Sequence, residues 1–150
     1  MTDSSIKPRL IASRFGLDNT TKALVILTGA GIIVAGYLTL KTADPGSVVC
    51  SIGGGCETVL SSQYAKIAGF PVAGLGLLWY MTLLAVTWLV YAKRVWSPLV
   101  AMIWVSGGLL FSLYLLYVSR FLIGAYCTWC LVSLGLVALI SLLVFTKGRK

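Results

Sequence analysis

The stretch "YCTWCLVSLGLVALISLLVFT", residues 126–146, decides the fold of this chain. It runs for 21 residues without Asp, Glu, Lys, Arg or His, a length that lets an α-helix cross the hydrocarbon core of a bilayer. A Cys-x-x-Cys pair, Cys127 and Cys130, stands at its start. Such pairs usually bind metals or carry out redox chemistry in water-facing domains, so its place at the mouth of a membrane span needs an explanation.

The chain contains three more apolar runs of this kind. We predict membrane spans over residues 22–41, 71–93 and 98–119, in addition to 126–146. Hydrophobic residues make up 59% of the 150 residues and only 4 residues are acidic, so too few charges remain to coat a soluble domain. The sequence therefore predicts an all-α integral membrane protein, with residues 1–150 forming a single membrane domain built as a four-transmembrane-helix bundle.

The interior of the predicted spans bears on the class of membrane protein. None of them carries an acidic or basic residue in its middle, whereas ion pumps and proton-coupled transporters usually do. Nothing in them resembles a channel filter or a charged ring. The first span contains Gly29, Gly31 and Gly36, which are small enough to let a neighbouring helix approach closely.

The basic residues predict how the chain is oriented in the membrane. Of the 12 Lys and Arg residues, nine lie before or at the start of the first predicted span, between the second and third spans or at the facing end of the second, or after the fourth. This positive-inside distribution predicts a multi-pass plasma membrane protein, in bacteria the inner membrane, with both termini in the cytosol. It also accounts for the net charge of +8 without nucleic acid as a partner. A largely polar segment of about 20 residues precedes the first apolar run, which favours a retained span over a cleaved signal peptide.

Residues 42–70 form the longest polar segment, and this topology places them on the periplasmic, extracytosolic side. Asp44-Pro45-Gly46 is a turn signal, and three consecutive glycines, residues 53–55, form a flexible tract. The apolar positions 59, 60, 64, 67 and 68 predict a short amphipathic helix after Cys56 that lies at the membrane interface. Glu57 falls in its first turn, where the helix dipole favours an acid.

All four cysteines fall on this extracytosolic side, in a compartment that is oxidising in bacteria. Cys50 and Cys56 lie in the loop, and Cys127 and Cys130 lie at the start of the last span. We expect Cys127 in the first helical turn, where free amide protons lower the pKa of a thiol, with Cys130 one turn deeper on the same face. This is the geometry of a reversible dithiol–disulfide switch.

Three uses fit two such pairs: an electron relay, two structural disulfides, or a zinc site of four thiolates. The glycine tract favours the relay, because a moving loop benefits from it and a static bridge does not. A relay needs a dithiol protein as its electron source. The chain has no flavin, haem or nucleotide motif, so a lipid-soluble quinone is the expected acceptor. Without histidine, the protons must come from thiols, water or a hydroxyl such as that of Ser61, Ser62, Tyr64 or Tyr80.

These motifs resemble the vitamin K epoxide reductase family over roughly residues 22–146. The resemblance rests on "CSIGGGC" (50–56), on Ser61 and Ser62, on "FPVAGLGLLWY" (70–80) and on "CTWC" (127–130). The other four-helix quinone-linked oxidase, the DsbB type, has its two cysteine pairs in the reverse order. The resemblance implies that Cys50 exchanges disulfides with a partner, that Cys56 passes electrons to Cys127, and that Cys130 faces the quinone. It also implies a quinone pocket lined by Tyr64, Leu75, Trp79, Tyr80, Leu115 and Leu134.

The resulting prediction is a membrane thiol oxidase that supports disulfide bond formation. The acceptor would be ubiquinone, menaquinone or phylloquinone, and the donor a separate periplasmic thioredoxin-like protein of the DsbA type, because the chain carries no fused thioredoxin-like domain. Vertebrate members place an Asn and a Tyr where this chain has Val72 and Leu134, which favours plain quinone reduction over epoxide reduction. The alternatives are a vitamin K epoxide or quinone reductase proper, or a non-catalytic membrane protein stabilised by zinc or by disulfides.

Overall fold

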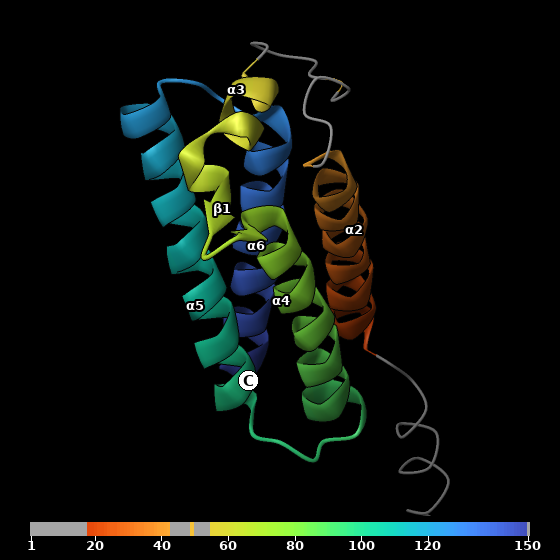
Figure 1. Ribbon diagram of the computed structural model, residues 1–150. Helices are drawn as coiled ribbons and strands as arrows, with labels where there is room; N and C mark the ends of the chain where they lie inside the picture. Colours follow the sequence, from red (N-terminus) through yellow and green to blue (C-terminus); the bar gives the residue numbers. More distant parts are fainter. Residues whose placement is uncertain (1–17, 43–48, 50–54, 150) are drawn as a thin grey trace, which may run out of the picture.

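A computed structural model of the chain describes residues 18–42, 49 and 55–149. Four long helices run antiparallel to their neighbours along the chain and form a bundle (Figure 1). They are α2 (Asn19–Lys41), α4 (Val72–Thr87) continued by the π-helix η3 (Trp88–Ala92), α5 (Pro98–Tyr117) continued by the π-helix η4 (Val118–Ile123), and α6 (Thr128–Gly148). With 23, 21, 26 and 21 residues, each is long and apolar enough to cross a membrane, which confirms the predicted four-span helical fold.

The helix boundaries follow local signals in the sequence. Ser97 caps α5 by accepting a hydrogen bond from the Leu99 amide at 3.4 Å, and Pro98 occupies the first helical position, where the third span was predicted to begin. The third span is longer than the predicted 98–119, because its apolar run continues in π-helical turns until Gly124 takes a left-handed φ of 71°. Proline also precedes α4, where Pro71 is the N-cap.

The four helices of the bundle do not pack equally closely on one another. α2 contacts α4 and α6 extensively, and α5 contacts α6, whereas α4 and α5 approach each other less. The fully buried core side chains Leu24, Leu83, Val105 and Ile140 belong to one cluster that links all four helices. This cluster lies mainly toward the end of the bundle where α2 begins and α6 ends.

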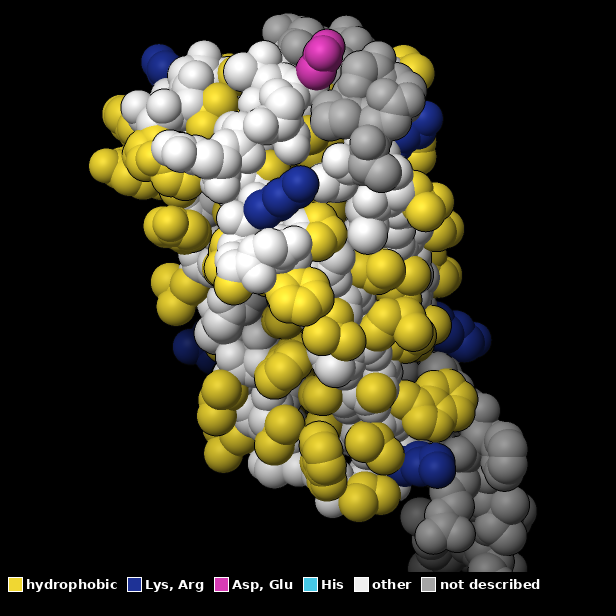
Figure 2. All heavy atoms as spheres, viewed as in Figure 1, with side chains coloured by type: hydrophobic (Ala, Val, Ile, Leu, Met, Phe, Trp, Pro, Cys, Tyr) yellow, Lys and Arg dark blue, Asp and Glu magenta, His cyan; other side chains and the backbone are white. Residues whose placement is uncertain are grey.

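The outside of the bundle is apolar. On α2, Ile26, Ile33 and Leu40 are 71%, 74% and 78% exposed, and their spacing of seven residues puts them on one outward stripe. Figure 2 shows hydrophobic side chains along the full height of the molecule, with few charged ones between them. Large apolar side chains exposed in this way are expected to face lipid acyl chains.

The segment after Cys56 folds differently from the single amphipathic helix predicted to reach residue 68. The helix α3 (Cys56–Ser61) is short, and Glu57 does lie in its first turn. It ends because Ser62 is extended, and a 3-10 turn η2 (Gln63–Ala65) follows. The strands β1 (Lys66–Ile67) and β2 (Phe70–Pro71) then form a small antiparallel hairpin. Positive φ values at Ala68 and Gly69 turn this hairpin, which is why the helix prediction is wrong there.

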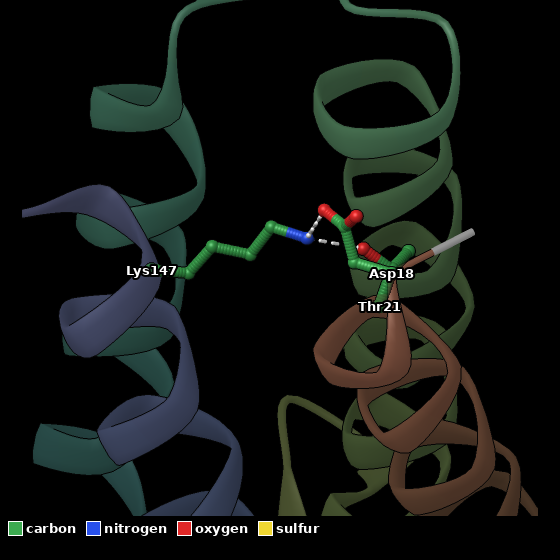
Figure 3. A network of polar contacts seen from close by, with 3 residues as sticks. All are labelled: Asp18, Thr21 and Lys147. Carbon is green, nitrogen blue, oxygen red and sulfur yellow. Dashed lines mark hydrogen bonds and ion pairs between the residues drawn. The ribbon is translucent and has the colours of Figure 1, made fainter. Parts of the chain in front are cut away.

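The first and last spans are joined at the end of the bundle remote from α3. The Lys147 ammonium lies 3.0 Å from the Asp18 carboxylate and also donates to the Thr21 hydroxyl (Figure 3). The same nitrogen lies 4.8 Å from the centre of the Tyr91 ring. The start of α2 and the end of α6 therefore share one end of the bundle, as four crossings require. That this end faces the cytosol stays a prediction.

Candidate active site

A tight turn between η4 and α6 delivers Cys127 to the site. The Ser119 hydroxyl donates to the Ala125 carbonyl at 2.5 Å, and the Ala125 amide donates back to the Ser119 carbonyl at 3.1 Å. Gly124 lies inside this turn and has a left-handed backbone conformation. After the turn, Cys127 has an extended backbone and is the N-cap residue of α6. Cys127 therefore precedes the first turn rather than lying in it, and Cys130 lies in that turn.

Cys127 and Cys130 form a hydrogen-bonded pair of free thiols. Cys127 is 1% exposed and Cys130 is partly buried. The pKa of Cys127 is lowered to about 7, chiefly because the Cys130 thiol donates a hydrogen bond to its sulfur. The backbone amides of Cys130 and Trp129 lower this pKa further, while burial opposes the shift. Cys127 is therefore both the more acidic thiol at this helix start and a good leaving group.

Cys56 approaches the same place from α3. Its side chain is fully buried and disulfide-bonded. Cys50, the fourth predicted cysteine, lies outside the described residues. A Cβ atom built on Gly55 would lie only 2.5 Å from the Tyr126 carbonyl oxygen. Since Gly55 precedes Cys56 and Tyr126 precedes Cys127, this close backbone approach brings the two cysteine-bearing segments side by side.

Trp129, the third residue of the Cys-x-x-Cys segment, contacts the other end of the loop. Its indole N–H donates to the Val49 carbonyl at 3.0 Å, and its ring centre lies 5.2 Å from that of Tyr37 on α2. Val49 is the residue directly before Cys50 in the sequence. The start of α6 is thus in contact with residues that immediately precede both loop cysteines.

A cavity of about 350 Å³ opens beside the thiol pair. The four long helices line it together with α3 and η2, and both Cys127 and Cys130 lie on its wall. Eight residues were predicted to line the quinone pocket or to supply its protons, and seven of them lie on this wall: Ser62, Tyr64, Leu75, Trp79, Tyr80, Leu115 and Leu134. The eighth, Ser61, is exposed, and its hydroxyl donates to the Glu57 carbonyl at 2.7 Å. Their role in binding quinone stays a prediction.

One polar pair on this wall involves a residue that the sequence reasoning missed. Tyr80 is 2% exposed, and its phenol oxygen lies 2.9 Å from the Ser133 hydroxyl on α6. Its ring packs so closely on Gly31 that an added Cβ there would overlap it, whereas Gly29 faces open space. Gly31 thus provides the close approach predicted for the first span. The signal for Ser133 was its spacing of three residues after Cys130, which places both on one helix face.

The fold and the site together define a multi-pass membrane protein with a buried dithiol beside an apolar cavity. The family model of the vitamin K epoxide reductase family matches residues 22–146, which is most of the chain. The chain belongs to this family and is a membrane oxidoreductase of the vitamin K epoxide reductase type. Members of the family generally use quinones.

Proposed function

We propose that this protein is a thiol oxidase that takes electrons from a dithiol protein and passes them through two cysteine pairs to a quinone, thereby supporting disulfide bond formation. The observation that carries the proposal is the apolar cavity with both Cys127 and Cys130 on its wall. Its volume of about 350 Å³ lies within the range of small-molecule pockets. Leu75, Trp79 and Leu134 would pack on a quinone ring or its isoprenoid tail.

Inward transfer is a pair of thiol–disulfide exchanges that conserve atoms and electrons. The partner first reduces the outer pair, Cys50 and Cys56, to thiols. The Cys56 thiolate attacks the Cys127–Cys130 disulfide at Cys127 and releases Cys130 as a thiol. Cys50 then attacks Cys56 and releases Cys127, so that the outer disulfide reforms and the inner pair is left reduced.

The lowered pKa of Cys127 supports its place in this sequence. Cys127 is the leaving group when Cys50 resolves the mixed disulfide, and a thiol of low pKa leaves faster. In the reduced state, the inner dithiol gives up two electrons and two protons as it returns to the disulfide. A bound quinone would accept that number of each and leave as the quinol.

The partner is proposed to be a separate thioredoxin-like protein of the DsbA type on the periplasmic side. The basic residues support this orientation, because Lys22, Lys93, Arg94, Lys147 and Arg149 belong to the end of the bundle remote from the cysteines. That end would face the cytosol.

Two alternatives lead to different experiments. A zinc site of four thiolates would need Cys56, which is disulfide-bonded here, in its reduced form. Metal analysis of the purified protein tests it, and stoichiometric zinc would contradict the relay. Epoxide reduction is tested by product analysis with epoxide and quinone in parallel. Val72 contributes no polar group to the cavity wall, so quinone reduction is expected to dominate.

The decisive experiment is anaerobic quinone reduction by the purified protein with a reduced thioredoxin-like partner. Cys→Ala at Cys50, Cys56, Cys127 or Cys130 should abolish turnover with the protein partner. With dithiothreitol, the Cys50→Ala variant should retain quinone reduction, because a small dithiol can reduce the inner pair directly. Full activity of Cys50→Ala with the protein partner would rule out the shuttle.

A further inference from the structure

We propose that the hydroxyl pair of Tyr80 and Ser133 donates the hydrogen bond, and transfers the proton, to the quinone oxygen beside Cys130. This inference rests on the proposed function and deepens it by assigning an acid to the same cavity. The two oxygens lie 2.9 Å apart, and both residues line the cavity. Ser133 follows Cys130 by three residues on α6, so its hydroxyl and the inner thiol are on the same face of one helix.

Counting hydrogen-bond donors distinguishes this pair from two of the serine hydroxyls on the wall. The Ser62 hydroxyl donates to the Val59 carbonyl, and the Ser119 hydroxyl donates to the Ala125 carbonyl. Each of these two residues has thereby committed its only hydroxyl proton to the backbone. Tyr80 and Ser133 together own two hydroxyl protons, and the 2.9 Å bond between the two hydroxyls uses one. The phenol also lies 3.3 Å from the Ser133 carbonyl, so the pair presents its second proton to a ligand when the phenol donates to the Ser133 hydroxyl and not to this carbonyl.

The phenol of Tyr80 is held in place before any ligand arrives. Its ring is in direct contact with Gly31 of α2, where a Cβ atom would overlap it. The Trp79 ring meets it edge-on with centres 5.1 Å apart, and Ser133 fixes its hydroxyl from α6. A donor fixed in this way does not have to reorganise when negative charge develops on a quinone oxygen, which is the condition for strong electrostatic catalysis.

The proton balance closes without an additional reagent. Oxidation of the Cys127–Cys130 dithiol releases two electrons and two protons as the S–S bond forms. The Tyr80–Ser133 pair passes one proton to the nearer quinone oxygen and is reprotonated from the thiol pair. The second proton reaches the other oxygen from the thiols or through water. The pair is unchanged over a full cycle, and the net reaction is dithiol plus quinone to disulfide plus quinol.

The test compares Tyr80→Phe, Ser133→Ala and the double variant in the full-length protein with a short-chain benzoquinone. We expect each single variant to lower kcat for quinone reduction by ~10-fold or more, as for removal of one preorganised donor. The double variant should be little worse than the single ones, because the two hydroxyls act as one unit. Oxidation of the same thiols by diamide, which needs no donor at a quinone oxygen, should stay within ~2-fold of wild type.

Matched controls lie on the same helices outside the cavity. Tyr91→Phe removes a phenol hydroxyl from η3, and Ser141→Ala removes a hydroxyl bonded to its own helix at the Val137 carbonyl. Both should keep the wild-type kcat. The quinone-induced rise in melting temperature gives a readout independent of turnover, and it should shrink in the Tyr80→Phe variant only if the phenol contacts the ligand.

Three results would overturn the assignment. One is wild-type quinone reduction in both single variants. Another is an equal loss of quinone and diamide rates, which would indicate a purely structural role. The last is a loss that appears instead in Ser112→Ala, a hydroxyl on the α5 side of the cavity. If the wild-type protein reduced no quinone at all, the proposed function would fall and this inference with it.

Discussion

Replacing Gly55 by alanine tests whether the loop and the inner pair are positioned for direct exchange. The backbone of Gly55 has φ −81° and ψ −3°, which any residue adopts, so the substitution acts only through space. The new Cβ would lie 2.5 Å from the Tyr126 carbonyl oxygen, 3.0 Å from its nitrogen and 3.1 Å from the Ala125 Cβ. Restoring ordinary contact at 3.4 Å requires a separation of about 0.9 Å between these segments.

This separation falls directly between the residues that precede Cys56 and Cys127. Thiol–disulfide exchange requires the two sulfurs to meet in line, and a misplacement of about 1 Å in such a geometry costs about 10²-fold in rate. We therefore expect transfer between the two pairs to slow by about two orders of magnitude in Gly55→Ala. The chemistry of the inner pair itself should not change, because neither Cys127 nor Cys130 is altered.

Two measurements isolate this step. In a Cys50→Ala/Cys130→Ala background, Cys56 and Cys127 are the only cysteines, and the rate at which a mild oxidant joins them reports their approach. Adding Gly55→Ala should slow this cross-link. In the otherwise native protein, Gly55→Ala should slow quinone reduction driven by the protein partner. It should leave reduction driven by dithiothreitol near wild type, because the small dithiol reaches the inner pair without the loop.

Gly135→Ala is the matched control, since a Cβ atom there meets nothing within 4 Å. It should behave as wild type in both measurements. An unchanged cross-linking rate in Gly55→Ala would refute the reasoning, since the steric displacement would then have no effect on how the two cysteines meet. An equal loss with dithiothreitol would also refute it, because the defect would then lie in the inner pair or the cavity.

Two further predictions concern the inner pair and the cavity wall. The alkylation rate of Cys127, followed by peptide mass spectrometry, should rise with pH to half its maximum near pH 7. Cys130→Ala should move this midpoint upward, because it removes the hydrogen bond that chiefly lowers the pKa of Cys127. An unmoved midpoint would contradict that cause. Gly108→Ala should force the Trp79 ring into the cavity and raise the KM for quinone by ~10-fold, whereas Gly29→Ala, which faces open space, should not.

The long elements of this fold were predictable because hydropathy alone determines them. Runs of about 20 apolar residues have few alternatives to membrane helices, and prolines at 71 and 98 marked two of their starts. The segment after Cys56 was less predictable. Over a dozen residues, a helical spacing of apolar positions does not distinguish one helix from a short helix, a 3-10 turn and a hairpin. The hairpin turns at Ala68-Gly69, a weaker turn signal than Asn-Gly.

The site shows the same division. Cys127 and Cys130 were found from their spacing and from the helix that follows, because both are local features of the sequence. Ser133 and Gly55 were not, because what matters about each is a contact with another segment: the Tyr80 hydroxyl for one and the Tyr126 backbone for the other. A serine inside a membrane helix most often bonds its own backbone, as Ser141 does here. The spacing of Ser133 from Cys130 places it on the face of the thiol, but it does not identify Tyr80 as its partner.

The end of the bundle near α3 contains the cavity, so it has fewer packing contacts than the opposite end. These contacts are regained when a ligand fills the cavity. The wall of the cavity of about 350 Å³ is mostly apolar, so its side chains gain packing contacts when an apolar molecule fills it. The core around Leu83, Val105 and Ile140 stabilises the opposite end of the bundle. Water is a poor substitute for a ligand, because an apolar cavity attracts little of it. An apolar molecule from the bilayer suits such a cavity better than water does. The lipid environment that makes a Cys-x-x-Cys pair look misplaced at the start of α6 is thus also the source from which the proposed quinone would reach the cavity beside it.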